Sequence, residues 1–485
     1  MRGWSFDFLY LRAGQEPIPG GAVVVEAGDV VWAGPASGAP VRCTHMGGVA
    51  LPGFVDAHVH LTATGLELTA LNAGEFDNIP DLLAAIGRQV PDVSGVVRVW
   101  GFDHDQYREG RYPTLAELDA ACPDHLLWIN HIESHGTLVN SKSLNTLGVV
   151  SNHALLVGVE NGIARQFFMG RITQEQRRAG IWAAVELALA RGVTSIHAME
   201  GGRLFHNLDI LAVQQLLPEL PIDIVLYPQV TEVDYALSLG LKQIGGCLPL
   251  DGSSGVYTAA LTSTYHQSDE QGHLYFSREE LLGFARAAQK AGLQMAMHAC
   301  GDAAIDLALD VIEIAAREYP APLRHRIEHF EIPRRDQARR CRDLNVILSM
   351  QPAFDWFWGG PDGDYARTLG PERWQDVNPL GWAVAEGLPV AGGSDSGVTP
   401  LNPLLGIQAA VSHHNPVQRV DVARALAMFT EDAALAGGAK AGRLVPGQRA
   451  NITVLSADPH TEPVNSIRYI PVLATFVGGE LRYCH

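Results

Sequence analysis

Leu51-Pro-Gly-Phe-Val-Asp-Ala-His-Val-His-Leu61 is an apolar stretch that ends in two histidines one residue apart, His58 and His60. In a β-strand, residues i and i+2 project from the same face, so both imidazoles can reach one point. Neutral imidazole is a good ligand for zinc and its neighbouring divalent metals. Many strands nevertheless end in such a pair without binding anything. The stretch therefore predicts a metal-binding strand end only if the rest of the chain supplies further ligands.

Three further candidate ligands, His298, His329 and Asp395, each stand at the end of their own apolar run. Taken singly, a core histidine, a charge network and an Asx turn would explain them equally well. Together with His58 and His60 they occupy four successive predicted strand ends, with two candidate ligands at the first end and one at each of the other three. Four imidazoles and one carboxylate can hold one or two divalent ions, and a bound ion lowers the pKa of its water to ~7. A carboxylate that touches this water can take its proton and pass it to a leaving amine.

Composition excludes several classes of protein. The chain has 485 residues, 47% of them hydrophobic, which suits one domain of about 250 residues or more plus a smaller one. The net charge is −18, so we expect neither nucleic acid nor an anionic membrane as a partner. No apolar run reaches the ~18 residues of a membrane span, and the N-terminus does not resemble a secretory signal. Six scattered cysteines without a pairing pattern indicate a reduced, cytoplasmic protein.

Both ends of the chain are predicted to form strands, and we expect the two ends to pair into one small sheet domain. The N-terminal end has two such runs separated by a glycine-bearing turn, and the C-terminal end has two more, the last ending at Gly478-Gly479. The predicted strands are residues 22–26, 29–33, 447–455 and 471–477.

The middle of the chain alternates between helical and strand patterns. Helical spacing is evident at 80–88, 178–190 and 278–286. Short apolar runs follow these and similar segments, at 97–100, 193–197, 294–298, 326–329, 346–350 and 389–393. Helix followed by strand, repeated this often, favours parallel strands with crossover helices. Over ~350 residues a distorted (β/α)8 barrel fits better than an open sheet, although the pattern alone leaves both possible, and in such barrels chemistry occurs where strands end.

Motifs spread over nearly the whole chain carry a family resemblance. Besides the opening stretch they are Trp100-Gly-Phe-Asp103, His135-Gly-Thr-Leu-Val-Asn-Ser141, Gly192-Val-Thr194, His298-Ala-Cys-Gly-Asp302, Arg326-Ile-Glu-His329, Gln351-Pro352, Gly393-Ser-Asp395 and Gly442-Arg-Leu-Val-Pro-Gly447 through Asp458-Pro459. On these motifs the chain resembles the amidohydrolase superfamily, in the branch of N-substituted formamide deformylase and the YtcJ-like hydrolases (amidohydrolase family 3). The resemblance implies an α/β fold in which residues 55–430 form a (β/α)8 barrel. It also implies a small β-sandwich built from residues 1–54 and 431–485.

The resemblance assigns roles to the candidate ligands. It implies that His58, His60 and Asp395 bind a first metal and that His298 and His329 bind a second. Asp395 would also be the general base toward the attacking water and would pass the proton to the departing nitrogen. The implied cofactor is one or two divalent ions per chain, with zinc as the first expectation and manganese or iron as alternatives.

One position departs from the family pattern. Relatives in this branch place a lysine shortly before Asp-Gly after the fourth barrel strand, and in many superfamily members such a lysine bridges the two metals. In Gly245-Gly-Cys-Leu-Pro-Leu-Asp-Gly252 our alignment puts Cys247 at that place, with Lys242 outside the register. A cysteine thiolate can bind zinc, at about 2.3 Å, so we count Cys247 as a candidate ligand. If it is an inert thiol, a single-metal site on His58, His60 and Asp395, joined or not by His298, is the alternative.

The residues expected to face the substrate are less sharply defined. The resemblance places His135 toward the substrate, where it could orient a carbonyl or stabilise an oxyanion, with an indirect positioning role as the alternative. The stretch 354–359 is unusually aromatic for a chain with 7% aromatic residues, and we expect it to be a loop that either lines a pocket for an apolar or aromatic group or packs as a lid. The candidate substrate-binding residues are Trp100, Asp103, His135, Gln351, Trp356 and Trp358.

We therefore expect a metal-dependent hydrolase that cleaves an amide-like C–N bond of an N-acyl or N-formyl compound, with Asp395 as general base. The alternative within the superfamily is a hydrolytic deaminase or another cyclic C–N or C–O hydrolase, for which Glu200 and Glu328 are the only acids in suitable places. A non-catalytic binding scaffold of the same fold is the alternative from a different class. A small molecule is the expected partner, and a homodimer is the assembly that the resemblance suggests.

Overall fold

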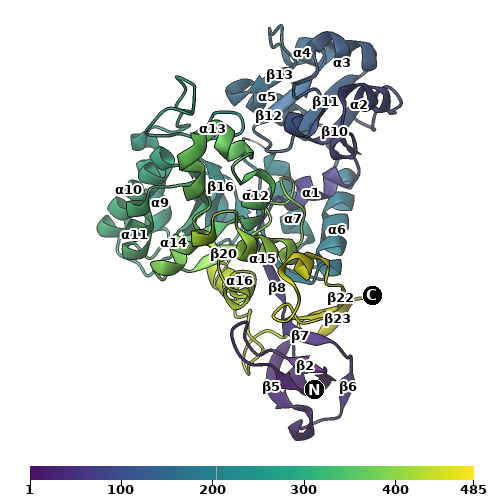
Figure 1. The fold of residues 1–485 in the computed structure, drawn as a ribbon, viewed down its shortest axis with the longest axis vertical. Helices are drawn as coiled ribbons and strands as arrows, with labels where there is room; N and C mark the ends of the chain where they lie inside the picture. The colour runs from purple at the N-terminus through teal and green to yellow at the C-terminus, as the bar shows by residue number, and fades with distance from the viewer. Residues whose placement is uncertain (204) are drawn as a thin grey trace.

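The computed structural model describes residues 1–203 and 205–485 and shows three structural regions stacked along the long axis of the molecule (Figure 1). A sheet with four helices lies at one end, two groups of parallel strands with flanking helices lie in the middle, and sheets built from the chain termini lie at the other end. None of the helices in the described part of the chain combines the length and apolar character required to cross a bilayer.

Eight parallel strands form the middle region and follow one another in chain order within two sheets. The first sheet has the order β15-β14-β8 and the second the order β16-β17-β18-β19-β20. Edge strands of the two sheets contact each other, β15 with β16 and β20 with β8, and a single parallel bridge joins Val59 to Ser396. The strands are β8 (Phe54–Val59), β14 (Val193–Glu200), β15 (Asp223–Pro228), β16 (Gln243–Pro249), β17 (Gln294–Gly301), β18 (Arg326–Ile332), β19 (Ile347–Met350) and β20 (Val390–Gly392).

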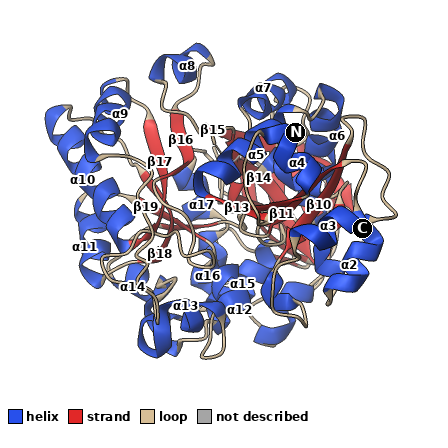
Figure 2. Ribbon diagram, turned by 90° about the horizontal axis from the view of Figure 1, so that it is seen from above, coloured by secondary structure: helices blue, strands red, loops and turns tan. Residues whose placement is uncertain are grey.

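Helices surround these parallel strands (Figure 2). The strands are buried on both faces, as parallel strands covered by crossover helices must be. Two helices near the start of the region pack backbone to backbone, because a side chain on Gly65 would overlap Gly180. The helices are α1 (Leu61–Glu67), α6 (Gln174–Ala190), α7 (Asn207–Leu216), α8 (Val233–Ser238), α9 (Arg278–Lys290), α10 (Asp302–Glu318), α11 (Arg335–Asp343), α14 (Leu380–Ala385), α15 (Pro403–Ser412), α16 (Val422–Met428) and α17 (Glu431–Ala436).

The mixed α/β fold is confirmed, as are the predicted helices at α6 and α9 and the predicted strands at β14, β17, β18, β19 and β20. The sheets do not show a closed eight-stranded barrel as one hydrogen-bonded unit, because pairing is interrupted between β15 and β16. Five of the eight parallel strands, β14, β17, β18, β19 and β20, nevertheless lie where the alternation of helix and strand patterns placed them, whereas β15 and β16 were not predicted as strands.

A separate sheet follows α1 and was not anticipated. The run 97–100, which the sequence pattern grouped with the other parallel strands, is part of β10 and pairs only with β9 and β11 in this sheet. Apolar strand runs look alike whichever sheet they join, so periodicity could not assign it. The order is β13-β12-β11-β10-β9. The elements are β9 (Leu71–Asn72), β10 (Val96–Phe102), β11 (Leu126–His131), β12 (Gly136–Val139), β13 (Leu155–Val157), α2 (Ile79–Ile86), α3 (Leu115–Ala121), α4 (Ser141–Leu147) and α5 (Gly158–Gly170).

The two chain ends pair in one sheet, as expected. Strand β7 from the N-terminal segment runs antiparallel to β21 from the C-terminal segment, with Leu51 opposite Thr453. This sheet has the order β23-β22-β21-β7-β2-β3, and a second one, β5-β4-β1-β6, shares a hydrophobic core with it. The strands are β1 (Arg2–Ser5), β2 (Phe8–Leu9), β3 (Ile18–Pro19), β4 (Gly21–Glu26), β5 (Asp29–Pro35), β6 (Cys43–His45), β7 (Val49–Pro52), β21 (Ile452–Leu455), β22 (Val472–Val477) and β23 (Glu480–Cys484).

The aromatic stretch expected to be a loop is a helix, α12 (Pro352–Trp358). Proline at its first position suits a helix start, because its missing N–H would have no partner there. A second helix, α13 (Asp364–Arg373), follows α12 along the chain.

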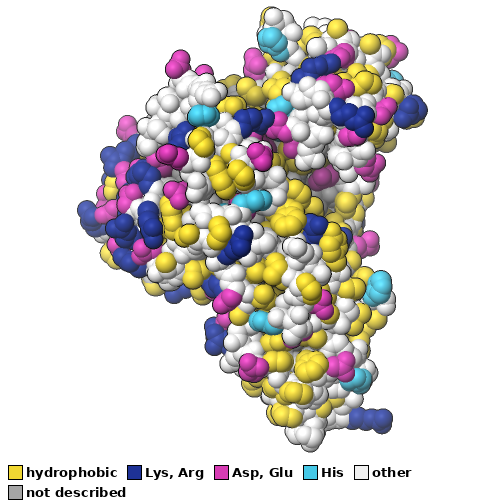
Figure 3. Space-filling model, viewed as in Figure 1, with side chains coloured by type: hydrophobic (Ala, Val, Ile, Leu, Met, Phe, Trp, Pro, Cys, Tyr) yellow, Lys and Arg dark blue, Asp and Glu magenta, His cyan; other side chains and the backbone are white. Residues whose placement is uncertain are grey.

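On the face shown in Figure 3, basic and acidic side chains alternate over α10 and α11. They form ion pairs, such as Arg334 with Asp306 at 2.9 Å and Arg340 with Asp310 at 2.8 Å. These cations are neutralised by neighbours on the same surface, so they leave no extended basic patch over these helices.

A buried histidine links α9 to the parallel strands and makes stability depend on pH. The backbone N–H of Met295 donates to His325 Nδ1 at 3.1 Å, and His325 Nε2 in turn donates to Gln289 Oε1 at 2.6 Å. This pattern requires a neutral ring, and burial lowers the pKa of His325 from 6.5 to about 4. Because the pKa of His325 is lowered in the folded state, its contribution to the free energy of unfolding is complete above pH 6.5 and is lost as pH falls toward 4.

We expect His325→Gln to reduce stability at pH 8 and to reduce its acid sensitivity. Between pH 8 and pH 5 the wild type should lose about 2 kcal/mol more unfolding free energy than the variant, since only its unfolded state gains a proton at residue 325. Urea unfolding at both pH values measures the difference, with the exposed His45→Gln as control. Equal pH dependence in wild type and His325→Gln would contradict this role.

Candidate metal centre and cavity

Two histidines from the end of β8 meet an aspartate that follows β20. Asp395 Oδ1 lies 3.1 Å from His60 Nε2 and 3.4 Å from His58 Nε2. All three side chains are buried, and their candidate ligand atoms lie close enough to surround one ion. The structure therefore brings together the three residues expected to form the first metal site.

Backbone contacts between β8 and the segment after β20 create this convergence. The N–H of Asp395 donates to the carbonyl of His58 at 2.8 Å. Gly393 permits the approach, because a Cβ there would lie 2.8 Å from the backbone nitrogen of His58. Asp395 itself has a φ of 53°, a left-handed conformation that costs a non-glycine residue of the order of 1 kcal/mol or more. Such strain persists only where the surrounding contacts enforce it.

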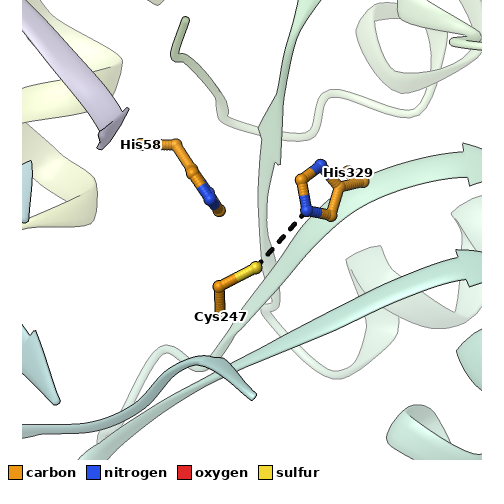
Figure 4. A group of neighbouring side chains, drawn as sticks. All are labelled: His58, Cys247 and His329. Atoms are coloured by element: carbon orange, nitrogen blue, oxygen red, sulfur yellow. Dashed lines mark hydrogen bonds between the residues drawn. The ribbon is translucent and has the colours of Figure 1, made fainter. Parts of the chain in front are cut away.

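A second group, of His58, Cys247 and His329, lies beside the first (Figure 4). Cys247 comes from β16 and His329 from β18, and the three side chains point toward one another. Cys247 Sγ lies 3.4 Å from His329 Nε2 and 3.6 Å from His298 Nδ1. His329 also has a positive φ, of 72°. Cys247 thus lies among imidazoles that the sequence assigned to both expected metals, His58 to the first and His329 to the second.

Three of the imidazoles are oriented by hydrogen bonds on their outer nitrogens. His58 Nδ1 lies 2.7 Å from Glu328 Oε2, and His60 Nδ1 donates to the carbonyl of Met199 at 3.0 Å. His329 Nδ1 lies 2.8 Å from Gln351 Oε1. An outer partner of this kind fixes the tautomer and turns Nε2 toward the centre, as in known metal sites.

The donor set fits a divalent cation. Among the described residues, His58 Nε2 and Asp395 Oδ1 are buried and make no hydrogen bond. Buried polar atoms are normally paired, so two such atoms facing each other call for a ligand between them. Imidazole nitrogen, carboxylate oxygen and thiolate sulfur are the donors that zinc prefers.

Electrostatics favour the metal-binding protonation states of His60, His329 and Asp395, whereas burial raises the pKa of the Cys247 thiol well above its usual value. Burial lowers the pKa of His60 and lowers that of His329 to about 3, so both rings are neutral near pH 7. Burial alone would raise the pKa of Asp395, but the neighbouring imidazoles, His58 foremost, hold it below its usual value. His60 and His329 therefore present neutral rings, and Asp395 presents an ionised carboxylate.

His298 is oriented differently. Its Nε2 donates to the carbonyl of Gly252 at 3.1 Å and lies 3.4 Å from Asp251 Oδ1, so its Nδ1 faces Cys247. Burial acts to lower its pKa, but the hydrogen bond and charge of Asp251 raise it overall. Asp251 also accepts hydrogen bonds from the backbone N–H groups of Ala260, Cys300 and Gly301.

A cavity with about 570 Å³ of atom-free space, partly open to solvent, adjoins these residues. His135 and Trp358, two predicted substrate-binding residues, line it. Aromatic rings and two carboxyl groups complete much of its wall. The residues concerned are Phe205, Phe354, Tyr365, Glu133 and Glu331.

The other predicted substrate-binding residues lie elsewhere. Trp100 is buried against Trp128 and donates through Nε1 to the carbonyl of Gly397 at 3.4 Å. Asp103 lines a neighbouring cleft, and Trp356 lies under the guanidinium of Arg468. Gln351 reaches the centre only through its contact with His329, described above.

Sequence reasoning missed the carboxyl groups of the cavity. Glu331 was within reach, since it lies two residues beyond His329 on β18 and so projects to the same side. Glu133 offered no local signal, because it belongs to the unanticipated sheet region and reaches the cavity only through the packing of that region on the parallel strands.

We expect Glu328→Gln to weaken metal binding about 10- to 100-fold, because the carboxylate orients His58 and raises its basicity. Glu328 also accepts from Arg326 at 2.8 and 2.9 Å, so thermal unfolding should be recorded alongside. Titration with a chelator, followed by elemental analysis of the retained metal, measures the change. Glu186→Gln, the same change on the exposed face of α6, is the control. Unaltered metal retention in Glu328→Gln would refute the orienting role.

Comparison with known proteins agrees with the fold and the centre. Residues 46–483 match the amidohydrolase family model. The chain is 26% identical to putative amidohydrolase YtcJ of Bacillus subtilis, over 90% of this chain and 89% of that protein. It is 25% identical to N-substituted formamide deformylase of Arthrobacter pascens, with the same coverage. A crystal structure of an uncharacterized metal-dependent hydrolase from Pyrococcus horikoshii is 26% identical, with a TM-score of 0.77 over 96% of this chain and 99% of that one.

A family match over most of the chain, combined with buried histidine and aspartate side chains that converge on one point, identifies the class of protein. The chain belongs to the amidohydrolase family and is a metal-dependent hydrolase that acts on carbon–nitrogen bonds.

Proposed function

We propose that this protein hydrolyses the amide-like C–N bond of N-acyl compounds, N-formyl compounds in particular, with Asp395 as general base. The observation that carries the proposal is the buried, unpartnered Asp395 Oδ1 beside His58 and His60 at the edge of an aromatic cavity. The N-formyl substrate is supported by the similarity to a formamide deformylase.

His58, His60 and Asp395 would hold the first divalent ion. His298 and His329 would hold the second, with Cys247 Sγ beside both as a further candidate ligand. Zinc is the metal that this donor set suits best. A bound divalent ion lowers the pKa of water in contact with it to ~7 and polarises a carbonyl oxygen.

The side chains of this protein supply positioning and proton transfer. Asp395 is ionised and its carboxylate can accept a proton from the attacking water, then donate it to the departing nitrogen. His135 lines the cavity, and burial lowers its pKa well below 6.5, so the neutral ring can donate a hydrogen bond to the acyl oxygen as negative charge develops. The aromatic walls bind the apolar part of the substrate.

The deaminase alternative depends on a further acid at the centre, for which Glu200 and Glu328 were candidates. Glu200 accepts from the backbone N–H of Thr62 at 3.1 Å and is not part of the cavity lining. Glu328 is engaged by Arg326 and His58. Both acids therefore have structural partners, which favours amide hydrolysis.

We further infer that the two parallel sheets work as one barrel-like unit, with the terminal sheets as a β-sandwich beside it. The strands run in chain order, β20 contacts β8, and backbone hydrogen bonds join Asp395 to His58 and His60 to Ser396. This arrangement supports active-site residues at the carboxyl ends of the strands.

We expect Asp395→Asn and His58→Ala each to abolish turnover of N-formyl amides, by at least about 1000-fold in kcat/KM. Formate release measures the activity, and ammonia release tests for deamination. Asp234→Asn, an exposed aspartate on α8, serves as the matched control. Full activity in either variant, with the fold intact by circular dichroism, would refute the mechanism.

We expect Cys247→Ser to lower the bound metal from two ions to one per chain, because serine is a far weaker zinc ligand than thiolate. Elemental analysis of metal-loaded protein measures the stoichiometry. Cys43→Ser changes a partly exposed thiol outside the cavity and is the control. Two ions in Cys247→Ser would exclude the thiolate as a required ligand.

A further inference from the structure

The cavity that adjoins the candidate metal centre contains two carboxyl groups that the hydrolytic mechanism does not use. Glu133 and Glu331 both line it. No lysine or arginine appears among the described residues that line it. The cavity thus has two carboxyl groups to offer a ligand and, among its described lining residues, no lysine or arginine to oppose them.

The two carboxyl groups have only neutral neighbours as hydrogen-bond partners. Ser253 Oγ donates to Glu133 Oε2 at 2.8 Å, and Ser254 Oγ lies 3.5 Å from Glu331 Oε1. Within the described chain, no arginine or lysine forms an ion pair with either residue. Burial raises the pKa of Glu133, and the charge of Asp364 adds to this. A desolvated carboxylate is unfavourable until a cation approaches it, so the pair is suited to receive one.

The space around Glu133 is kept open by a glycine. A Cβ at Gly255 would lie 2.4 Å from Glu133 Oε1. Any side chain there would displace the carboxyl group from its present position. The loop that carries Ser253 and Gly255 therefore both supports Glu133 and leaves it room at the cavity wall.

Aromatic rings accompany the carboxyl groups. Phe205, Phe354, Trp358 and Tyr365 line the same cavity. The faces of aromatic rings attract organic cations, and rings combined with carboxylates are a recurrent means of binding ammonium groups. An inorganic cation would not need these rings, so the combination points to an organic ammonium ion.

The approach to the cavity is acidic as well. A neighbouring cleft shares Trp358 with the cavity and is lined by Asp103, Asp105, Asp362 and Asp364, with Arg367 as its one basic residue among those described. Arg367 is already paired with Asp105 and Asp364. Negatively charged clefts concentrate cations and speed their association. The net charge of −18 acts in the same direction.

We propose that the natural substrate carries a protonated amino group, so that it is an N-acyl compound such as a mono-N-acylated diamine. Glu133 and Glu331 bind its ammonium group, and the aromatic rings surround the linking segment. The acyl group then lies at the candidate metal centre. This inference rests on the proposed N-acyl hydrolysis and adds the charge of the substrate to it.

An isosteric pair of substrates tests the proposal. N-formyl-4-(aminomethyl)benzylamine and N-formyl-4-ethylbenzylamine differ in a terminal NH3⁺ against CH3. With the metal-loaded enzyme at pH 7.5, we expect kcat/KM to favour the ammonium compound at least tenfold. The preference should fall toward one in Glu133→Gln/Glu331→Gln and persist in the exposed control Glu186→Gln. A wild-type ratio of one or less, or a ratio unchanged in the double variant, would overturn the proposal.

The single variants Glu133→Gln and Glu331→Gln keep one carboxyl group each and should show intermediate ratios. They keep the test decisive if the double variant does not fold. Raising the salt concentration should reduce the preference in the wild type, because the acidic cleft is exposed to solvent.

A binding measurement separates this inference from the proposed function. Calorimetry with benzylammonium and with benzyl alcohol on the metal-loaded protein requires no turnover. Tighter binding of benzylammonium that is lost in the glutamine variants supports the cation site. If neither formamide is hydrolysed in the same experiments, only the N-formyl function is rejected. If both formamides are hydrolysed, and the two probes bind equally well whether or not Glu133 and Glu331 are replaced, the cation site is rejected and the hydrolytic function is retained.

Discussion

The approach of β20 to β8 is the constraint on which the centre depends. Two backbone hydrogen bonds, from the N–H of Asp395 to the carbonyl of His58 and from the N–H of His60 to the carbonyl of Ser396, link the two segments at the level of the ligands. Gly393 makes the approach possible, and the left-handed conformation of Asp395 turns its carboxylate back toward His58 and His60. A chain that could not bring these segments together would have the same ligand residues and no site.

Two buried charged residues, Arg326 and Glu328, lie on the outer side of His58. Arg326 is fully buried, yet it donates to Glu328, to the hydroxyl of Ser349 and to the carbonyl of Ala57. Glu328 in turn contacts His58. The pKa of Glu328 is held to about 2, mainly because the charge of Arg326 outweighs the effect of burial. A fixed anion behind His58 keeps this imidazole oriented toward the ligands in front of it.

The cavity joins parts of the chain that have separate folding origins. Glu133, Ser134 and His135 come from the sheet that follows α1, whereas the candidate metal ligands come from the parallel strands. Trp358 and Tyr365 come from α12 and α13. The parallel strands thus provide the chemistry, and the added segments provide most of the surface that a substrate meets. Variation in these segments can change the substrate while the centre is preserved, as is usual when loops and insertions surround a rigid scaffold.

The sequence by itself determined much of the helix and strand alternation and the pairing of the two chain ends, and it predicted the candidate ligand set, because these depend on local periodicity and on short motifs such as His58-Val-His60. It could not assign residues 97–100 to the separate sheet, since an apolar strand reads the same in either sheet. The helical state of 352–358 was also missed, because an aromatic run has no decisive local preference. Only the tertiary structure brought Glu133 and Glu331 to one cavity and removed Trp100 and Trp356 from it. Side chains far apart along the chain meet through packing, and packing is a property of the whole fold rather than of any segment.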